Sequence, residues 1–180
     1  MTQERDVKAR WYLLYTNPRA EKKAEAELVK RGYEVFLPIH KTLKQWSDRK
    51  KWVEEPLFKS YIFIYTEIEK QYYDILNVTG IVKFVNFEKN PAVVDPREIS
   101  LVKLMVGNLG DSIGVEVIDG NWEGEIGDEV QVIAGVLIGT KGKMKYKNGT
   151  KFLQIELETM HQTILVSMPQ EFVKLIPATN

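Results

Sequence analysis

The pattern of apolar and polar positions separates a mixed helix-and-strand part of the chain from a later part made of strands. The apolar run 11–15 predicts a strand buried on both faces. Asn17 and Pro18 suit a helix N-cap and first helical position, and Gly32 suits a helix end, so a helix is expected between them. The same reasoning predicts a hairpin over 33–53 with a charged tip at 44–51, followed by a strand over 57–65. A second helix, capped by Thr66 and Glu69, should run to about Asn77. Strands at 82–87 and 92–94 and a third helix over about 96–106, capped by Asp95, complete this part.

This order of elements is typical of an α+β sandwich with a mainly antiparallel sheet. Residues 108–126 are rich in glycine and in acids and are interpreted as a linker, within which 115–118 alternates like a strand. Residues 127–177 alternate apolar and polar positions between turn signals, which predicts a small all-β module of about five strands. The expected domains are therefore 10–107 and 127–177.

Composition narrows the class of protein. In 180 residues an apolar share of 44% can fill a core, and no apolar run approaches the roughly 20 residues that a membrane span needs. The first ten residues lack the apolar core of a secretory signal, and cysteine is absent. We therefore expect a soluble cytoplasmic protein without membrane contact, disulfides or a bound metal. No heptad pattern indicates an obligate oligomer, so a monomer is expected.

The net charge of zero conceals a division along the chain. Residues 1–107 hold 19 basic and 15 acidic side chains, a balance of +4, whereas residues 108–180 hold 6 and 10, a balance of −4. Residues 108–129 carry seven acids and neither Lys nor Arg. A neutral total is therefore compatible with a local basic surface for nucleic acid in the first part.

Three glycines punctuate the start of the all-β module. The segment 127–142, GDEVQVIAGVLIGTKG, places them at 135, 139 and 142, where positive φ or close backbone approach would be possible. This segment resembles a KOW motif, which marks SH3-like β-barrels that attach to the transcription and translation machinery. The resemblance implies that Gly135, Leu137 and Gly139 contact a partner. A purely structural barrel remains the alternative.

Four phrases in a fixed order carry a wider resemblance. They are WYLLYTNPRAEKKAEAEL from residue 11, EPLFKSYIFIY from residue 55, GIVKFVNFEKNPAVVDPREI from residue 80, and the terminal KOW segment. Together they resemble the NusG family of transcription elongation factors, with an N-terminal NGN domain and a C-terminal KOW domain. The N-terminal phrases are most similar to RfaH-like specialised paralogues.

The resemblance implies a function that is not enzymatic and needs no cofactor. The NGN domain would bind the coiled-coil clamp helices of RNA polymerase and suppress pausing or termination. The KOW domain would recruit a ribosomal protein or the termination factor Rho. RfaH-like members also read a DNA element on the non-template strand, and some hold the C-terminal domain as an α-hairpin over the polymerase site. Here the glycine content and strand alternation of 127–177 predict a β-barrel from the outset, with the polymerase site open or only loosely covered.

An aromatic set matches the family's clamp-helix pocket at Tyr15, Tyr61, Phe63 and Phe84. Tyr61 and Phe63 share one face of their strand, and Ile62 and Ile64 share the other. If the isoleucines face the helices, the aromatic rings line an open apolar surface of the kind that binds partners. Without the resemblance, the four rings would be interpreted as ordinary core residues.

A basic set surrounds the predicted hairpin and opens the first helix. Its members are Lys41, Lys44, Arg49, Lys50 and Lys51 with Trp46 among them, and Arg19, Lys22 and Lys23. Cationic side chains neutralise phosphates, and an aromatic side chain between them can stack on an unpaired base. Because the hairpin matches the family's DNA-facing side, contact with the non-template strand is predicted. A solvated tip without a ligand is the alternative.

The chain departs from the family pattern in three segments. RfaH-like proteins carry a His-Thr-Thr-Thr type motif on the second helix, where this chain has Gln71 to Asp74. In the KOW domain, Gly-Pro-Phe is replaced at 135–137 and Phe-Gly-Arg at 160–162. These departures leave the far-side polymerase contact and the identity of the KOW partner open.

Two other classes of protein compete with this interpretation. A ribosome- or RNA-associated KOW protein without polymerase contact would share the C-terminal signal, and binding to purified polymerase core separates the two. A hydrolase or transferase is disfavoured, because His40 and His161 have no ligand-like spacing and no phosphate loop or nucleophile set is visible.

Overall fold

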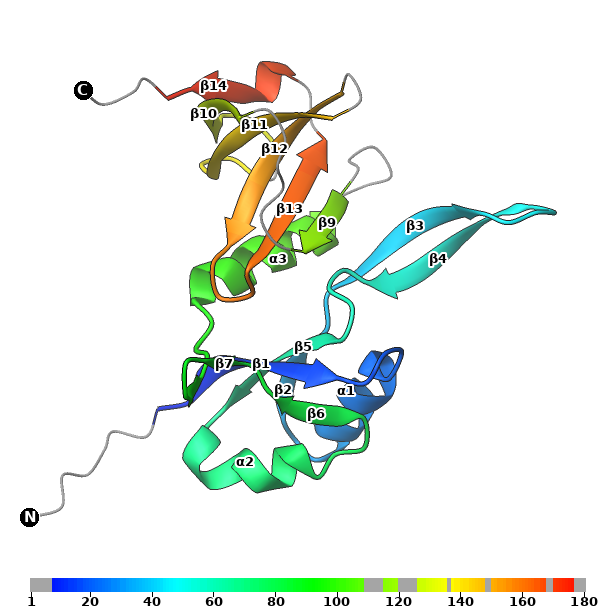
Figure 1. The fold of residues 1–180 in the computed structure, drawn as a ribbon, viewed down its shortest axis with the longest axis vertical. Coiled ribbons are helices and arrows are strands. Elements are labelled where there is room, and N and C mark those ends of the chain that lie inside the picture. Colours follow the sequence, from blue (N-terminus) through cyan, green and yellow to red (C-terminus); the bar gives the residue numbers. More distant parts are fainter. Residues whose placement is uncertain are drawn as a thin grey trace, which may run out of the picture. The chain divides into compact units, whose positions relative to one another are not determined.

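The computed structural model describes residues 8–108, 115–119, 126–135, 137–147, 150–167 and 170–176. The chain divides into two compact units, Met1–Ile99 and Ser100–Asn180, and each is described by itself. Figure 1 traces both along the sequence. The architecture is mixed α/β with antiparallel strand pairing throughout the named sheets, in agreement with the predicted class.

The first unit is built on a four-stranded antiparallel sheet. Its strands are β1 (Arg10–Thr16), β2 (Glu34–Phe36), β5 (Tyr61–Thr66) and β6 (Ile81–Phe84), in the spatial order β2-β5-β1-β6. Helices α1 (Glu21–Lys30) and α2 (Ile68–Leu76) contribute Leu28 and Ile75 to the core that buries Ile62 and Ile64 of β5. The helices therefore cover one face of the sheet (Figure 1).

Helix α1 begins later than its sequence signals suggest. Its N-cap is Ala20, which makes no side-chain capping bond, and the N–H of Ala20 donates to the carbonyl of Asn17 at 3.1 Å. Arg19 has a φ of 64°, in the left-handed region. Because that conformation interrupts a helical path, the prediction that Asn17 and Pro18 start the helix is wrong. The two residues form a turn that precedes it.

Helix α2 also begins without the predicted capping box. Its N-cap is Glu67, with no side-chain capping bond. Thr66 is the last residue of β5, and its hydroxyl donates to the side-chain oxygen of Gln71. The Thr66 side chain therefore ties the strand to the helix instead of capping it with Glu69.

Helix α3 (Pro96–Asn108) has the predicted cap. Oδ1 of Asp95 accepts the N–H of Arg97 at 2.8 Å, and the carbonyl of Asp95 accepts the N–H of Glu98 at 2.9 Å. The helix runs to Asn108, beyond the expected end at about 106. No helix in the described ranges is long and apolar enough to cross a membrane.

The segment before α3 forms less strand than predicted. Strand β6 ends at Phe84, and β7 (Asn86–Phe87) pairs with β8 (Asn90–Pro91) in a separate small ribbon. Residues 92–94 make a single bridge, from Val93 to Tyr12, instead of a strand. Their backbone is nevertheless fixed to β1, because the N–H of Val94 donates to the carbonyl of Trp11 at 2.9 Å.

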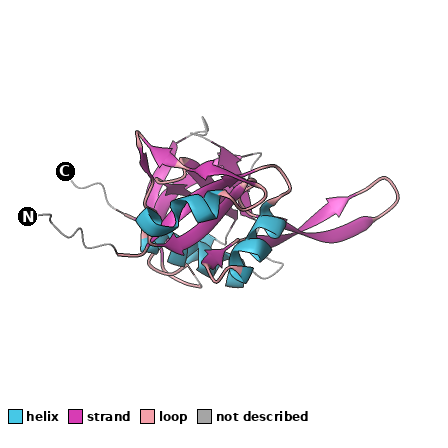
Figure 2. Ribbon diagram, turned by 90° about the horizontal axis from the view of Figure 1, so that it is seen from below, coloured by secondary structure: helices cyan, strands magenta, loops and turns pink. Residues whose placement is uncertain are grey.

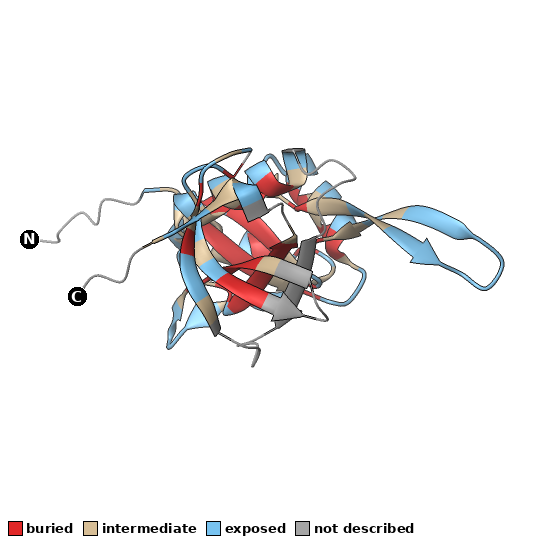
Figure 3. Cartoon of the chain, turned by 90° about the horizontal axis from the view of Figure 1, so that it is seen from above, coloured by how far each residue is buried: buried red, intermediate tan, exposed pale blue. Residues whose placement is uncertain are grey.

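The predicted hairpin projects from the first unit. It consists of β3 (Ile39–Gln45) and β4 (Lys50–Pro56), with Leu43 opposite Trp52. Figure 2 shows the two strands extending well beyond the sheet, and Figure 3 shows that most of their length is exposed. After the hairpin, Leu57 and Phe58 are buried before β5 begins at Tyr61, so the strand predicted from residue 57 starts four residues later.

The second unit is dominated by a six-stranded antiparallel sheet. Its strands are β9 (Val115–Asp119), β10 (Ile126–Val132), β11 (Lys141–Lys147), β12 (Thr150–Leu157), β13 (Gln162–Ser167) and β14 (Val173–Leu175), with the 3-10 turn η1 (Gln170–Phe172) before β14. The spatial order is β14-β10-β11-β12-β13-β9. Strand β9 lies inside the segment interpreted as a linker and pairs with β13. Residues 109–114 and 120–125 of that linker, and residues 148–149, lie outside the described residues.

One face of this sheet is apolar and tightly packed. Its buried side chains are Val130, Val132, Met144, Leu153, Ile155, Leu157, Ile164 and Val166. Gly142 is required by the same packing, because a Cβ there would lie 2.3 Å from the carbonyl oxygen of Gln154. The strands predicted for 127–177 are thus present, whereas a closed barrel is not seen among the described residues, where β14 and β9 end the sheet.

Candidate functional site

Strand alternation gives the two faces of the first sheet different chemistry. Leu14, Ile62 and Ile64 point into the core beneath α1 and α2. The neighbouring positions on β1 and β5 therefore point to the opposite face. The condition on which the aromatic surface was predicted, that the isoleucines face the helices, is therefore met.

Aromatic rings cover this opposite face, which we call the aromatic face. It comprises Trp11, Tyr15, Phe36, Tyr61, Phe63 and Tyr65. The rings of Tyr15 and Tyr61 meet edge to face with centroids 5.5 Å apart, and those of Trp11 and Tyr65 lie 5.4 Å apart. Such pairs hold each other in fixed orientations. The aromatic face is therefore a preformed surface.

Exposure varies across the aromatic face. Tyr65 is 38% exposed, and Tyr15 and Tyr61 are half-buried. Phe63 is only 1% exposed, because its ring is stacked on Phe36 at 5.8 Å and meets Phe58 at 6.0 Å. The tyrosines can thus meet a partner directly, whereas Phe63 supports them from within.

Phe84 does not belong to the aromatic face. It pairs with Leu14 across β1 and β6, so its side chain points to the helix side. There it is 1% exposed, stacked on Tyr72 with centroids 5.1 Å apart. The expectation that Phe84 lines the open surface is therefore wrong. Phe87, in the same predicted strand, is 63% exposed and lies in the separate β7–β8 ribbon.

The structure brings the two parts of the basic set together at the base of the hairpin. Nζ of Lys22, in the first turn of α1, donates to the carbonyl of Glu54 on β4 at 3.2 Å. All the predicted basic residues are exposed: Arg19, Lys22, Lys23, Lys41, Lys44, Arg49, Lys50 and Lys51. Strand pairing places Lys41 and Lys50 on one face of the hairpin and Lys44 and Lys51 on the other, so the basic residues surround the hairpin.

Two tryptophans lie on the hairpin. Trp46, a predicted stacking residue, is 50% exposed, and its backbone N–H donates to the carbonyl of Arg49 at 2.8 Å to close the tip. Trp52 is also 50% exposed and lies opposite Leu43, which is 46% exposed. Sequence reasoning did not include Trp52 among the stacking residues, although the sequence already predicts it at the start of the returning strand. The hairpin therefore offers two rings for stacking.

His40 and Glu55 lie opposite each other on β3 and β4 and make the electrostatic contacts on the face of the hairpin away from Trp52. Lys44 forms an ion pair with Glu55, and this hydrogen bond holds the pKa of the carboxyl below its usual range. Partial burial lowers the pKa of His40, against the pull of Glu55. Lys44 is thus engaged within the hairpin, which leaves Lys50 and Lys51 as better placed contacts for phosphate.

The segment of α2 that departs from the family motif is engaged mainly inside the first unit. Tyr72 is stacked on Phe84. Asp74 accepts a hydrogen bond from Arg31 at 2.9 Å and another from the Tyr33 hydroxyl. Burial and this bond to Asp74 raise the pKa of Tyr33 to about 12. Tyr73, which is 79% exposed, presents the segment's most exposed large hydrophobic side chain to a partner.

In the second unit, the predicted partner-binding loop joins β10 to β11. Gly135 and Gly139 both have positive φ, 79° and 89°, as tight corners require. Leu137 is 2% exposed and therefore anchors the loop instead of presenting it to a partner. Ile138, 67% exposed, and Ile133, 49% exposed, are the apolar side chains that the loop presents. Val136 lies outside the described residues.

The described residues contain no group of three or more His, Cys, Asp or Glu side chains that could hold a metal ion. The candidate binding sites are three surfaces: the aromatic face, the basic hairpin and the loop of the second unit.

Comparison with known proteins assigns the family. The family model described as transcription termination factor NusG matches residues 9–103, more than half of the chain. NusG of Thermotoga maritima, solved in a study of its domain interaction, has 21% sequence identity and a TM-score of 0.61, covering 94% of this chain and 98% of that one. The crystal structure of the MjSpt4:Spt5 complex in conformation B has 16% identity and a TM-score of 0.30, covering 94% and 99%. The first of these structures shows a shared fold, and the family match over 9–103 shows that this chain belongs to the NusG family of transcription factors.

Proposed function

We propose that this protein is a transcription elongation and antitermination factor that binds the clamp helices of RNA polymerase through its aromatic face. The observation that carries the proposal is the preformed Tyr15–Tyr61 pair, half-buried on the sheet face that α1 and α2 leave uncovered. Rings fixed in this way bury apolar area at a low entropic cost when a helix packs on them. Family membership supports the same assignment.

The proposal extends to nucleic acid and to a second partner. The basic hairpin, with Trp46 and Trp52, would contact the displaced non-template strand by phosphate neutralisation and stacking. The second unit would act as a KOW module that recruits a ribosomal protein or Rho, with Ile133 and Ile138 as its apolar contacts. An RfaH-like specialisation for selected operons would follow from sequence reading by the hairpin.

The experiment measures affinity for polymerase core and for a clamp-helix peptide. Tyr61→Ala should weaken both by about 2 kcal/mol, as expected for a central aromatic anchor. Tyr73→Ala is the matched control for the peptide, because it removes an exposed tyrosine from α2 outside the aromatic face. A folded Tyr61→Ala variant with parental affinity would contradict the proposal. A parent that binds ribosomes but not polymerase would favour the ribosome-associated alternative.

A further inference from the structure

Strand β11 carries an alternating lysine pattern that the proposed function does not use. In the sequence KGKMKYK, the lysines at 141, 143 and 145 occupy every second position and so share one face. Lys141 and Lys143 are exposed, whereas Lys145 is only 4% exposed. Successive lysines on one face are about 6.6 Å apart along the strand. Cations with this spacing suit a ligand whose negative charges also repeat along a line.

A third exposed lysine joins this row from the sheet edge. Gln131 of β10 lies opposite Lys141 on one side and opposite Lys174 of β14 on the other. The three lysines therefore share the outer face, across strands that are about 4.8 Å apart. Within the part of the chain that the structure describes, none of the three forms an ion pair. Their charge is available to a ligand.

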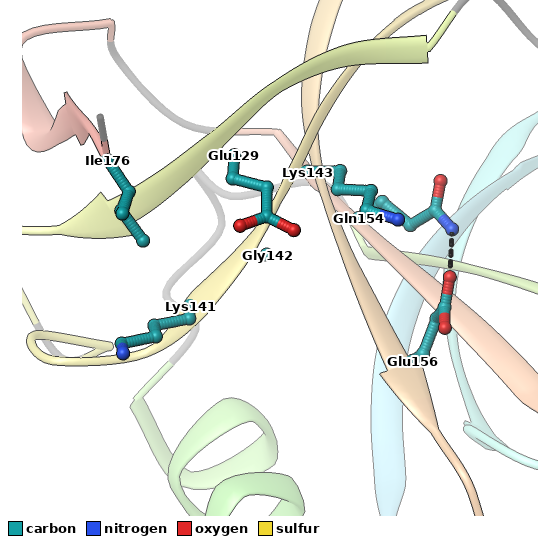
Figure 4. Close-up of a pocket in the computed structure, with 7 residues that line it drawn as sticks. All are labelled: Glu129, Lys141, Gly142, Lys143, Gln154, Glu156 and Ile176. Atoms are coloured by element: carbon teal, nitrogen blue, oxygen red, sulfur yellow. Dashed lines mark hydrogen bonds between the residues drawn. The ribbon is translucent and has the colours of Figure 1, made fainter. Parts of the chain in front are cut away.

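A groove lies beside this row of lysines, over β10, β11 and β12. It has a volume of about 250 Å³ and is lined by Glu129, Lys141, Gly142, Lys143, Gln154, Glu156 and Ile176. Figure 4 shows the charged side chains around it, with Glu129 beside Gly142 and Glu156 on the far strand. We call this site the lysine groove. Its volume is below the roughly 300–1,000 Å³ of drug-sized sites, which suits a part of a longer ligand.

The carboxylate of Glu156 is held in place within the lysine groove. Gln154 is 6% exposed, and its Nε2 donates to Oε1 of Glu156 at 2.9 Å. Its own amide oxygen has no hydrogen-bond partner among the described residues. The buried amide thus orients Glu156 through a single donated bond and leaves the second carboxylate oxygen to accept from a ligand.

We propose that the lysine groove binds single-stranded nucleic acid, with phosphates on Lys141, Lys143 and Lys174 and one nucleobase in the groove. A base offers N–H donors on its Watson–Crick edge for Glu156 and an apolar ring for Ile176. Guanine fits best, because its adjacent N1–H and N2–H groups can donate to the free oxygen of Glu156 and to the second lone pair of Oε1. An acidic peptide would also use the lysines, but its carboxylates offer no N–H donors to Glu129 and Glu156, whereas a base does.

The test measures binding of the full-length protein to labelled RNA and DNA strands of about 12 nucleotides, a length typical of such sites. Each strand is either all pyrimidine or carries one central guanine. Because the hairpin is also expected to bind nucleic acid, every measurement is repeated with Lys44, Arg49, Lys50 and Lys51 replaced by alanine. The site variant is Lys141→Ala/Lys143→Ala/Lys174→Ala. The control variant, Lys30→Ala/Lys70→Ala/Lys89→Ala, removes the same charge from exposed positions of the first unit.

The site variant should bind about tenfold more weakly than the control and should lower the slope of log affinity against log salt by roughly 2, because three phosphates are no longer neutralised. Glu156→Gln should abolish the guanine preference and leave that slope unchanged. Tighter binding of RNA would assign the transcript as ligand, and tighter binding of DNA the displaced strand. Equal affinity of site and control variants would overturn the proposal, as would stronger binding of a poly-glutamate peptide than of either strand. Clamp-helix binding is independent of these outcomes.

Discussion

In the first unit, the sheet face turned away from the helices carries aromatic rings, whereas in the second unit the outer face of β10, β11 and β14 carries lysines. Both surfaces arise from the same strand alternation. The aromatic rings are fixed by contact with one another, as in the Tyr15–Tyr61 pair. Lys141 and Lys143 are exposed instead. The first surface suits a shaped apolar partner, and the second suits a charged, flexible one.

The largest expected difference between the two surfaces is in stability. Phe63→Ala should lower the free energy of unfolding by about 3–5 kcal/mol, because the ring is fully buried against Phe36 and Phe58. Lys143→Ala should change it by less than about 0.5 kcal/mol, because the side chain is exposed. Denaturant unfolding of both variants measures this. Similar losses for the two would contradict the contrast between a packed and a hydrated surface.

The second largest expected effect is a loss of stability on substitution of Gly142, where β11 packs closely against β12 at the lysine groove. Gly142→Ala should destabilise the protein by about 1–3 kcal/mol, because the new Cβ would meet the backbone of β12 at 2.3 Å. Gly107→Ala is the control: its Cβ would meet nothing within 4 Å in α3, and alanine there should stabilise by about 0.5–1 kcal/mol. Thermal unfolding distinguishes the two signs. A neutral Gly142→Ala variant would mean that β11 and β12 are not so closely paired.

Features set by residues close together in the sequence were predicted correctly, whereas features set by pairing between distant strands were not. Alternation within β5 correctly separated Tyr61 from Ile62, because both lie on one strand. Phe84 was misplaced because its face depends on the register between β1 and β6, which places it opposite Leu14. No local pattern contains that register. The late start of α1 likewise reflects the backbone of Arg19, which residue types alone did not reveal.

The same holds for the candidate sites: those formed by one segment were predicted, and those that combine several strands were not. The basic hairpin residues are all exposed, as a polar tip implies. Trp52 was missed because its exposure follows from the projection of the hairpin away from the sheet (Figure 2). The lysine groove was missed because it combines residues of β10, β11 and β12. Leu137, to which the resemblance assigned a partner contact, is buried instead, and its neighbour Ile138 is exposed.

The hairpin should be a second electrostatic surface, with a moderate effect that depends on salt. Replacing Lys44, Arg49, Lys50 and Lys51 by alanine should flatten the salt dependence of elongation-complex affinity by roughly 0.7–0.9 for each phosphate that the variant no longer neutralises. Lys44 should contribute least, because it is paired with Glu55. Footprinting of the non-template strand at several salt concentrations measures this. An unchanged footprint and slope would mean that the hairpin does not touch DNA.

The smallest expected effect is a pH dependence within the hairpin. The pKa of His40 is lowered by burial, so between that value and the unfolded value near 6.5 the unfolded chain binds more protons. Stability should therefore fall as pH drops below about 6.5. The lowered pKa of Glu55 adds a further loss at more acidic pH, as pH falls through its folded value. His40→Gln should flatten the first part of this decline in urea titrations, and an unchanged decline would show that His40 does not cause it.

Site-specific crosslinking tests most directly whether the aromatic face binds the polymerase. A photoreactive phenylalanine analogue in place of Tyr65, which is 38% exposed on the same face of β5 as Tyr61, would be irradiated in a reconstituted elongation complex. The same analogue in place of Tyr73 on α2 serves as the control position. Crosslinks from position 65 to the clamp helices, absent from position 73, are the predicted result. Crosslinks from position 65 to any other polymerase element, or to none, would contradict the assignment of the aromatic face.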